Sequence, residues 1–156
     1  MTTMLERAVE LGPLIRQYAD QADRDRRLAP EVATAFAASG LYRLPAPKKF
    51  GGAEANPMTQ IEVIEAVARA DGSAGWNLMI GIEHFAMIKP DFLWCEELIA
   101  DPHIVISGST AATGRADRVE GGYRVSGKWQ FASGVHNSRL FAATVAIYDE
   151  GKKQSH

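Results

Sequence analysis

The stretch that decides the fold is SGKWQFASGVH, residues 126–136, together with the sequence that leads into it. Two short β-like segments in which apolar and polar residues alternate, residues 116–120 and 123–126, flank the pair Gly121-Gly122. A Gly-Gly pair between such segments is typical of a two-residue β-hairpin, because both central residues of the turn can take positive φ. The sequence therefore predicts an antiparallel hairpin at this point.

The second strand is expected to resume over residues 128–133 and to end at Gly134. Alternation along a strand would place Trp129, Phe131 and Ser133 on one face. Aromatic rings followed by a hydroxyl and a glycine suit a flat, partly polar ligand, because the rings offer apolar area and the glycine lets the backbone approach closely. The alternative interpretation is an ordinary core strand with a bulge.

Composition places the chain among ordinary globular proteins. It has 156 residues, of which 46% are hydrophobic and 23% charged, enough for one domain or a domain and a half with a sizeable core. The net charge of −2 gives no indication of binding to nucleic acid or to an anionic membrane surface.

The single cysteine, Cys95, excludes a disulfide framework and favours a reducing, cytoplasmic compartment. It is expected to be a small buried residue rather than a nucleophile. The N-terminus has no apolar signal segment, and no stretch is long enough to span a bilayer. No spacing of Cys, His and carboxylates suggests a metal site, and no phosphate-binding glycine loop is present.

Helical periodicity runs through the first hundred residues and then gives way to a strand-like period. Helices are expected over residues 3–27, from Pro30 to Gly40, from about Pro57 to 70, over 74–89 with Ser73 as its cap, and over 91–100. Four strands are expected, over residues 103–107, over 116–120, over 123–126 with its continuation at 128–133, and over 140–148, followed by a polar tail at 151–156. The fold class is therefore α+β, with an all-helical domain at residues 1–102 and a β-domain at 103–156.

Both parts look incomplete by themselves. The helix over residues 74–89 is apolar nearly all round and should be central in its bundle. A sheet of four strands needs a partner for its edges and its second face.

Two motifs resemble those of the acyl-CoA dehydrogenase superfamily of flavoproteins. GLYRLPAPKKFGG, residues 40–52, resembles the signature at the end of that family's second helix, and GGYRVSGK, residues 121–128, resembles its middle-domain hairpin. The resemblance covers nearly the whole chain in order. It implies a helical N-terminal domain and the beginning of a β-barrel-like middle domain.

The same resemblance implies that a C-terminal four-helix bundle is absent from this chain. In the family that bundle holds part of the flavin, carries the dehydrogenase glutamate and builds a tetramer. The chain departs from the dehydrogenases at one motif, because SGSTAATGRA, residues 107–116, lacks the family's Thr-Glu-Pro sequence. In this respect the chain is more similar to the two-component flavin-dependent monooxygenases that act on 4-hydroxyphenylacetate, steroid phenols or dibenzothiophene.

Such enzymes take reduced flavin, FMN or FAD, from a separate reductase. By position, the resemblance implies contacts with the flavin for several residues, namely Ser109, Thr110, Trp129, Phe131, Ala132 and Ser133. Ser133 would lie near the reactive ring edge, and His84 would face the substrate, so these two are the candidate catalytic residues. A cavity for flavin chemistry must be apolar with a few placed donors, and Trp76 and Phe85 are further candidates for its walls.

Each of these functional roles has an ordinary structural alternative. His84 can be a satisfied core histidine, and Ser133 a turn hydroxyl. Arg115, Arg139 and the cluster at residues 24–27 can be anion contacts, but solvated surface charge is the default.

Two other functions remain open from the sequence. One is an FAD-dependent acyl-CoA dehydrogenase that oxidises a CH–CH group of an acyl thioester. The other is a truncated, non-catalytic fragment that dimerises through exposed apolar edges.

Overall fold

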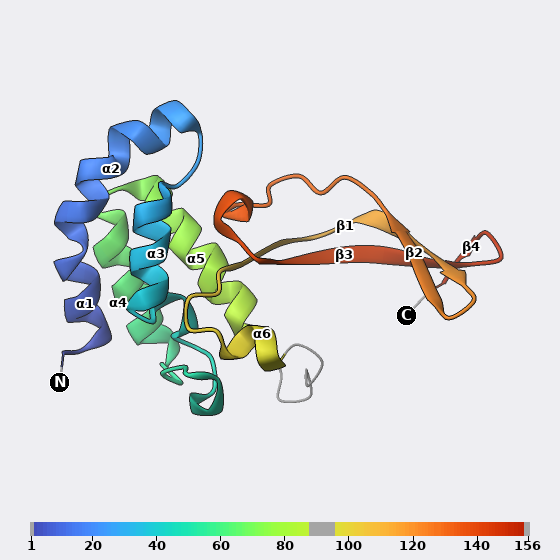
Figure 1. Ribbon diagram of the computed structural model, residues 1–156, viewed down its shortest axis with the longest axis horizontal. Helices are drawn as coiled ribbons and strands as arrows, with labels where there is room; N and C mark the ends of the chain where they lie inside the picture. The colour runs from blue at the N-terminus through green and yellow to red at the C-terminus, as the bar shows by residue number, and fades with distance from the viewer. Residues whose placement is uncertain (1, 88–95, 155–156) are drawn as a thin grey trace.

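The computed structural model describes residues 2–87 and 96–154, and it places the helices at one end and a long, narrow sheet at the other (Figure 1). The helices are α1 (Met4–Glu10), α2 (Gly12–Asp25), α3 (Pro30–Ala38), α4 (Pro57–Ala68), α5 (Gly72–Ala86) and α6 (Glu96–Ala100). The strands are β1 (Ile106–Val119), β2 (Gly122–Ser126), β3 (Leu140–Asp149) and β4 (Lys152–Lys153). This order confirms the α+β class. The division at residue 102 stays a prediction.

The helix expected over residues 3–27 is two helices. Leu11 ends α1 and caps α2, and Pro13 lies in the first turn of α2. Proline has no amide hydrogen and is tolerated only in a first turn, so a new helix starts where a continuous one was expected.

The cap of α5 also differs from the prediction. Asp71, rather than Ser73, accepts a hydrogen bond from the backbone N–H of Ala74 at 2.7 Å, and the Ser73 hydroxyl donates to the same carboxylate. Of the helix expected over residues 91–100, the structure describes only α6, because residues 91–95, which include Cys95, lie outside the described part. Residues 88 and 89, the expected end of the preceding helix, also lie outside it.

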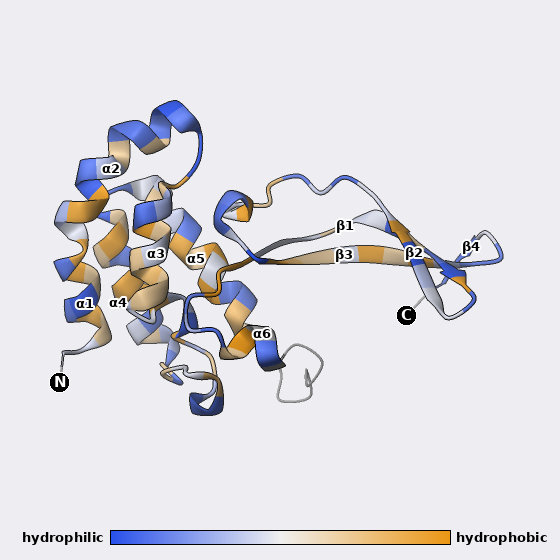
Figure 2. Ribbon diagram, viewed as in Figure 1, coloured by the Kyte–Doolittle hydropathy of each residue, from blue (hydrophilic) through white to orange (hydrophobic). Residues whose placement is uncertain are grey.

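The helical core forms around α5, as its apolar sequence predicts. This helix contacts α4, the short 3-10 helix η1 (Leu41–Arg43) and β1. Leu78 and Phe85 of α5 are fully buried. Orange, hydrophobic segments gather where α3, α4 and α5 face one another (Figure 2).

A buried arginine joins this core to the start of the β-part. Arg43 is 4% exposed, and its guanidinium donates to the backbone carbonyls of Phe50, Asp101 and, at 2.7 Å, Ile99. It also lies over the ring of Phe85, 5.1 Å from the centroid. Burial lowers the pKa of Arg43, and the Asp101 carboxylate opposes that shift. One side chain thus ties two separate segments of backbone, at Phe50 and over residues 99–101, to η1.

The sheet has the order β2-β1-β3-β4, with β1 and β3 parallel and the other two pairs antiparallel. The expected hairpin is confirmed, but its two-residue loop is Glu120-Gly121, because β1 and β2 pair up to Val119 opposite Gly122. Only Gly121 has positive φ, so the predicted turn with two such residues is wrong. The strand expected over residues 128–133 is wrong, because that segment joins no ladder. The separate strands expected over residues 103–107 and 116–120 are instead the two ends of one strand, β1, and the fourth strand is β4, which lies in the expected polar tail.

Side chains, not backbone pairing, hold the segment over 128–133 in place. The register between β1 and β3 shifts between Ser109 and Gly114, where β1 bulges. Ser109 Oγ donates to the Gln130 carbonyl at 3.2 Å, and Thr113 Oγ1 donates to the Lys128 carbonyl at 3.0 Å. The bulge therefore uses side-chain donors where a regular strand would use its ladder.

The start of β1 lies directly against α5. A Cβ built on Gly108 would come within 2.3 Å of the Ala142 carbonyl oxygen and 2.4 Å of His84 Nε2. Real Cβ atoms do not approach so closely, so only glycine fits between the helix and β3 here. This contact sets the position of the β-part on the helical part.

Replacing Arg43 with methionine should lower the free energy of unfolding by about 2 kcal/mol, because buried carbonyls would lose their donors. Urea denaturation measures the change. The control is Arg69→Met, which removes only an exposed ion pair with Glu65 and should cost under about 0.5 kcal/mol. Equal effects of the two substitutions would show that Arg43 does not hold the junction.

Gly108→Ala should destabilise the fold by about 1 to 3 kcal/mol through overpacking against backbone. The matched control is Gly122→Ala in the same sheet, where an added Cβ meets nothing within 4 Å. Thermal unfolding of both variants compares them. An unchanged melting temperature for Gly108→Ala would contradict the close approach of β1 to α5.

Candidate functional site

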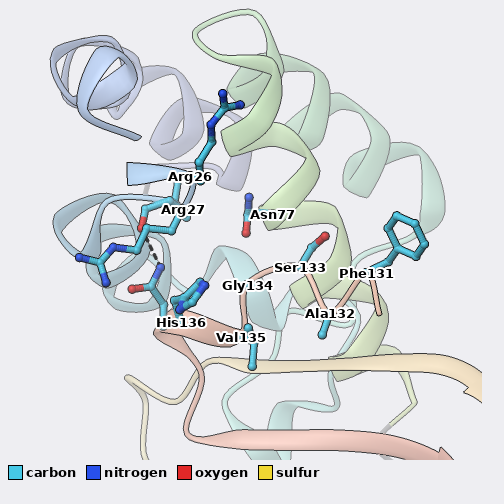
Figure 3. A pocket seen from close by; sticks show the side chains of 11 residues that line it. Arg26, Arg27, Asn77, Phe131, Ala132, Ser133, Gly134, Val135 and His136 are labelled. Atoms are coloured by element: carbon cyan, nitrogen blue, oxygen red, sulfur yellow. Dashed lines mark hydrogen bonds between the residues drawn. The ribbon is translucent and has the colours of Figure 1, made fainter. Parts of the chain in front are cut away.

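A pocket of about 290 Å³ lies where the end of α2, the first turns of α5 and the loop over residues 131–137 meet (Figure 3). Its size is close to the lower end of small-molecule sites. The three walls come from distant parts of the sequence, so the pocket exists only in the folded chain. Figure 3 shows Asn77 between the arginines at the end of α2 and the loop.

The loop has an unusual backbone at its first residue. Phe131 has φ of 57°, in the left-handed region that residues with a Cβ rarely adopt, and its side chain is 93% exposed. Nothing in its burial explains the conformation, and such strain is commonest at functional positions. An exposed aromatic ring is thus presented at the edge of the pocket.

Hydrogen bonds close the loop on itself yet leave some donors free. Ser133 N–H donates to the Phe131 carbonyl at 2.9 Å, and Val135 N–H donates to the Ala132 carbonyl at 3.2 Å. The backbone N–H groups of Ala132 and Gly134 have no partner within the described residues. Both residues line the pocket.

Helix α5 holds the loop through Trp76. The indole Nε1–H donates to Ser133 Oγ at 2.9 Å, across 57 residues of sequence. Because Ser133 Oγ is the acceptor, its own hydroxyl hydrogen remains able to donate. The contact fixes Ser133 at the pocket while the indole stays 54% exposed.

On the opposite side, the loop is tied to the chain between α2 and α3. Asn137 Nδ2 donates to the Leu28 carbonyl at 2.9 Å, and Leu28 itself is buried. The pocket walls are therefore connected to each other and to the core, rather than resting side by side.

The structure brings together some of the predicted site residues. Phe131, Ala132 and Ser133 all line the pocket. Ser109 is buried and donates to the Gln130 carbonyl, and Thr110 is exposed on the bulge; neither is among the lining residues.

Trp129 also lies elsewhere. Its ring packs on Gly114 at the bulge, its Nε1–H donates to the Thr144 carbonyl at 2.8 Å, and it meets Phe141 edge-on. The expected common face for Trp129, Phe131 and Ser133 is wrong, because the segment is not a strand. Trp129 packs at the bulge, whereas Ser133 is held by Trp76.

His84 is 6% exposed and is not a lining residue of this pocket. Its Nδ1 lies 2.7 Å from the Ile80 carbonyl, which favours a hydrogen on that nitrogen and leaves Nε2, next to Gly108, as the acceptor. Phe85 is fully buried beneath Arg43, so it forms core rather than a cavity wall. A catalytic role for His84 stays a prediction.

Sequence reasoning missed Asn77 and assigned the end of α2 to solvent. Arg26 caps α2 with φ of 54°, and it lines the pocket with Arg27. The sequence offered one signal for Arg26: α2 ends without the glycine that a left-handed cap usually needs. Asn77 carried no local signal.

The other two arginines considered as anion contacts are paired. Arg115 binds Asp117 at 2.5 Å, which lowers the pKa of that carboxyl, and Arg139 binds Asp101 at 2.5 Å. Across residues 2–87 and 96–154, no group of His, Cys, Asp and Glu is arranged to hold a metal ion. Within the same ranges, every helix is too short or too polar to cross a membrane.

Comparison with known proteins defines the class. The family model of the acyl-CoA dehydrogenase N-terminal domain matches residues 12–90, half of the chain. The chain therefore belongs to the acyl-CoA dehydrogenase superfamily.

Particular relatives are monooxygenases. The chain is 33% identical over 125 residues to indole-3-acetate monooxygenase of Pseudomonas putida, covering 80% of this chain and 32% of the relative. It is 30% identical over 154 residues to the flavin-dependent monooxygenase oxygenase subunit HsaA of Rhodococcus jostii, covering 95% and 39%. The chain thus spans under half the length of these curated relatives.

A solved structure has the same fold. XiaF from Streptomyces sp., determined in complex with FADH2 and glycerol, superposes with a TM-score of 0.88 at 25% identity, covering 97% of this chain and 39% of XiaF.

Phe131→Gly should leave stability unchanged or raise it by up to about 1 kcal/mol, because glycine adopts positive φ without a Cβ clash and no packing is lost. Phe131→Ala, which keeps the strain and removes the ring, is the control. Chemical denaturation compares them. If Phe131→Gly were the less stable of the two, the backbone at residue 131 would not be strained.

Proposed function

We propose that this chain forms part of the oxygenase component of a two-component, flavin-dependent monooxygenase that hydroxylates an aromatic small molecule with O2. The observation that carries the proposal is the strained loop of Phe131, Ala132 and Ser133, anchored to Trp76, in a chain whose relatives include flavin-dependent monooxygenases.

The donor set of the pocket fits a flavin ring. An isoalloxazine has a flat apolar face and an edge of ring nitrogens and carbonyl oxygens that accept hydrogen bonds. Phe131 offers an exposed ring, and the Ser133 hydroxyl and the N–H groups of Ala132 and Gly134 offer donors without partners among the described residues. These four residues would hold the flavin.

Each of these residues has a separate task. Phe131 would cover apolar ring surface and exclude water from it. Ser133, which Trp76 positions, would donate a hydrogen bond to an acceptor at the ring edge. The reduced flavin supplies the electrons that activate O2; the protein supplies orientation and a dry surface.

The relatives' names, which include an indole-3-acetate monooxygenase and a FADH2-dependent resorcinol hydroxylase, support an aromatic substrate class. We expect an aromatic substrate, reduced FMN or FAD from a separate reductase, a homo-oligomer for the whole protein, and a cytoplasmic location. The second candidate is an acyl-CoA dehydrogenase, because the family model that matches residues 12–90 is the N-terminal domain of that enzyme.

Anaerobic titration with reduced and oxidised FMN and FAD tests the proposal. We expect the reduced forms to bind more tightly, and Ser133→Ala to weaken that binding about fivefold to tenfold through loss of one hydrogen bond. Ser126→Ala, at an exposed position of β2, is the matched control.

Preference for oxidised FAD would instead support the dehydrogenase. Absence of binding to any of the four would leave the chain as a non-catalytic fragment and would contradict the proposal.

A further inference from the structure

The same pocket has a second side whose chemistry differs from that of the flavin-facing loop. Its ionisable lining residues are Arg26, Arg27 and His136, and no carboxylate is among them. This is a local excess of positive charge in a chain whose net charge is −2.

The two arginines are largely unpaired. Arg26 has one distant ion pair, 3.9 Å from Asp23, with both side chains about 85% exposed, and such pairs contribute little. Arg27 has no ion pair or side-chain hydrogen bond within the described part of the chain. An adjoining hollow shares Arg26 and Arg27 with this pocket and is also lined by two carboxylates, Asp23 and Asp71, of which Asp71 is engaged in capping α5.

Local structure does not explain the arginine at position 26. Its left-handed conformation at the end of α2 would suit glycine better, since a Cβ is disfavoured there. Thus the pocket has two lining residues with strained backbones, Arg26 and Phe131, on opposite walls. A guanidinium kept at such a cost in stability points to a ligand.

We propose that this side of the pocket binds the anionic end, a carboxylate or a phosphate, of the planar ligand that the loop receives. Arg26 and Arg27 provide charge-assisted donors, and the N–H groups of the loop complete the set. The proposal rests on the proposed function only for the source of the anion. A phosphate would belong to the flavin, whereas a carboxylate would belong to the aromatic substrate.

Calorimetric titration at low salt separates these sources with two pairs of probes. Reduced FMN is compared with reduced riboflavin, which lacks the phosphate, and phenylacetate is compared with 2-phenylethanol, which lacks the carboxylate. We expect the charged member of at least one pair to bind about tenfold more tightly, as a charged hydrogen bond predicts.

Arg27→Gln should abolish this preference, and Arg24→Gln, which removes an exposed arginine outside the pocket, should retain it. Arg26→Gly provides a variant that suits the left-handed cap, so it should fold at least as well as the parent while losing the preference. Both predictions concern binding and need no turnover.

The binding results distinguish failure of the anion site from failure of the proposed function. If neither flavin binds but phenylacetate is preferred over 2-phenylethanol, the proposed function fails and the anion site stands. If no preference exists in either pair, or if Arg24→Gln matches Arg27→Gln, the anion site is overturned even where flavin binds.

Discussion

The close approach of β1 to α5 at Gly108 is the constraint on which the rest of the structure depends. With no side chain at this position, the strand passes between His84 and the Ala142 carbonyl. The parallel partner β3 is then placed beside β1, and the loop between β2 and β3 returns over the first turns of α5. One helix, α5, therefore supports both the start of the sheet and the candidate site. Arg43 stabilises the same junction, because it packs on Phe85 of α5 and donates to the Ile99 carbonyl just before β1.

The geometry of the candidate site follows from this arrangement of α5, β1 and the loop. The loop is attached at two points, because Trp76 donates to Ser133 and Asn137 donates to the Leu28 carbonyl. The segment before it is held by Ser109 and Thr113 at the bulge in β1. Strain at Phe131 is thus maintained by tertiary contacts, and the backbone presents free donors beside an exposed ring. This combination suits a ligand with a flat apolar face and a polar edge better than it suits a core.

The sequence could predict those features of the fold that depend on the local pattern of residues. The helical period, the Gly-Gly hairpin and the central position of α5 all follow from spacing within a few residues. The segment over 128–133 has the alternation of a strand, but its partners at Ser109 and Thr113 are side chains on a bulge, which alternation does not reveal. Likewise Ser133 was found by resemblance to a family motif, whereas Asn77 and Arg27 reach the pocket only through packing of α2 and α5.

Amide hydrogen exchange of the whole chain, with and without reduced FMN under anaerobic conditions, tests the central claim that the loop over residues 131–137 is the ligand site. The account predicts that Ala132 and Gly134, whose N–H groups lack partners among the described residues, exchange fast in the free protein and slow down when the flavin is added. The hairpin residues of β2 should not change. Unaltered exchange in the loop, with protection appearing elsewhere, would contradict the account.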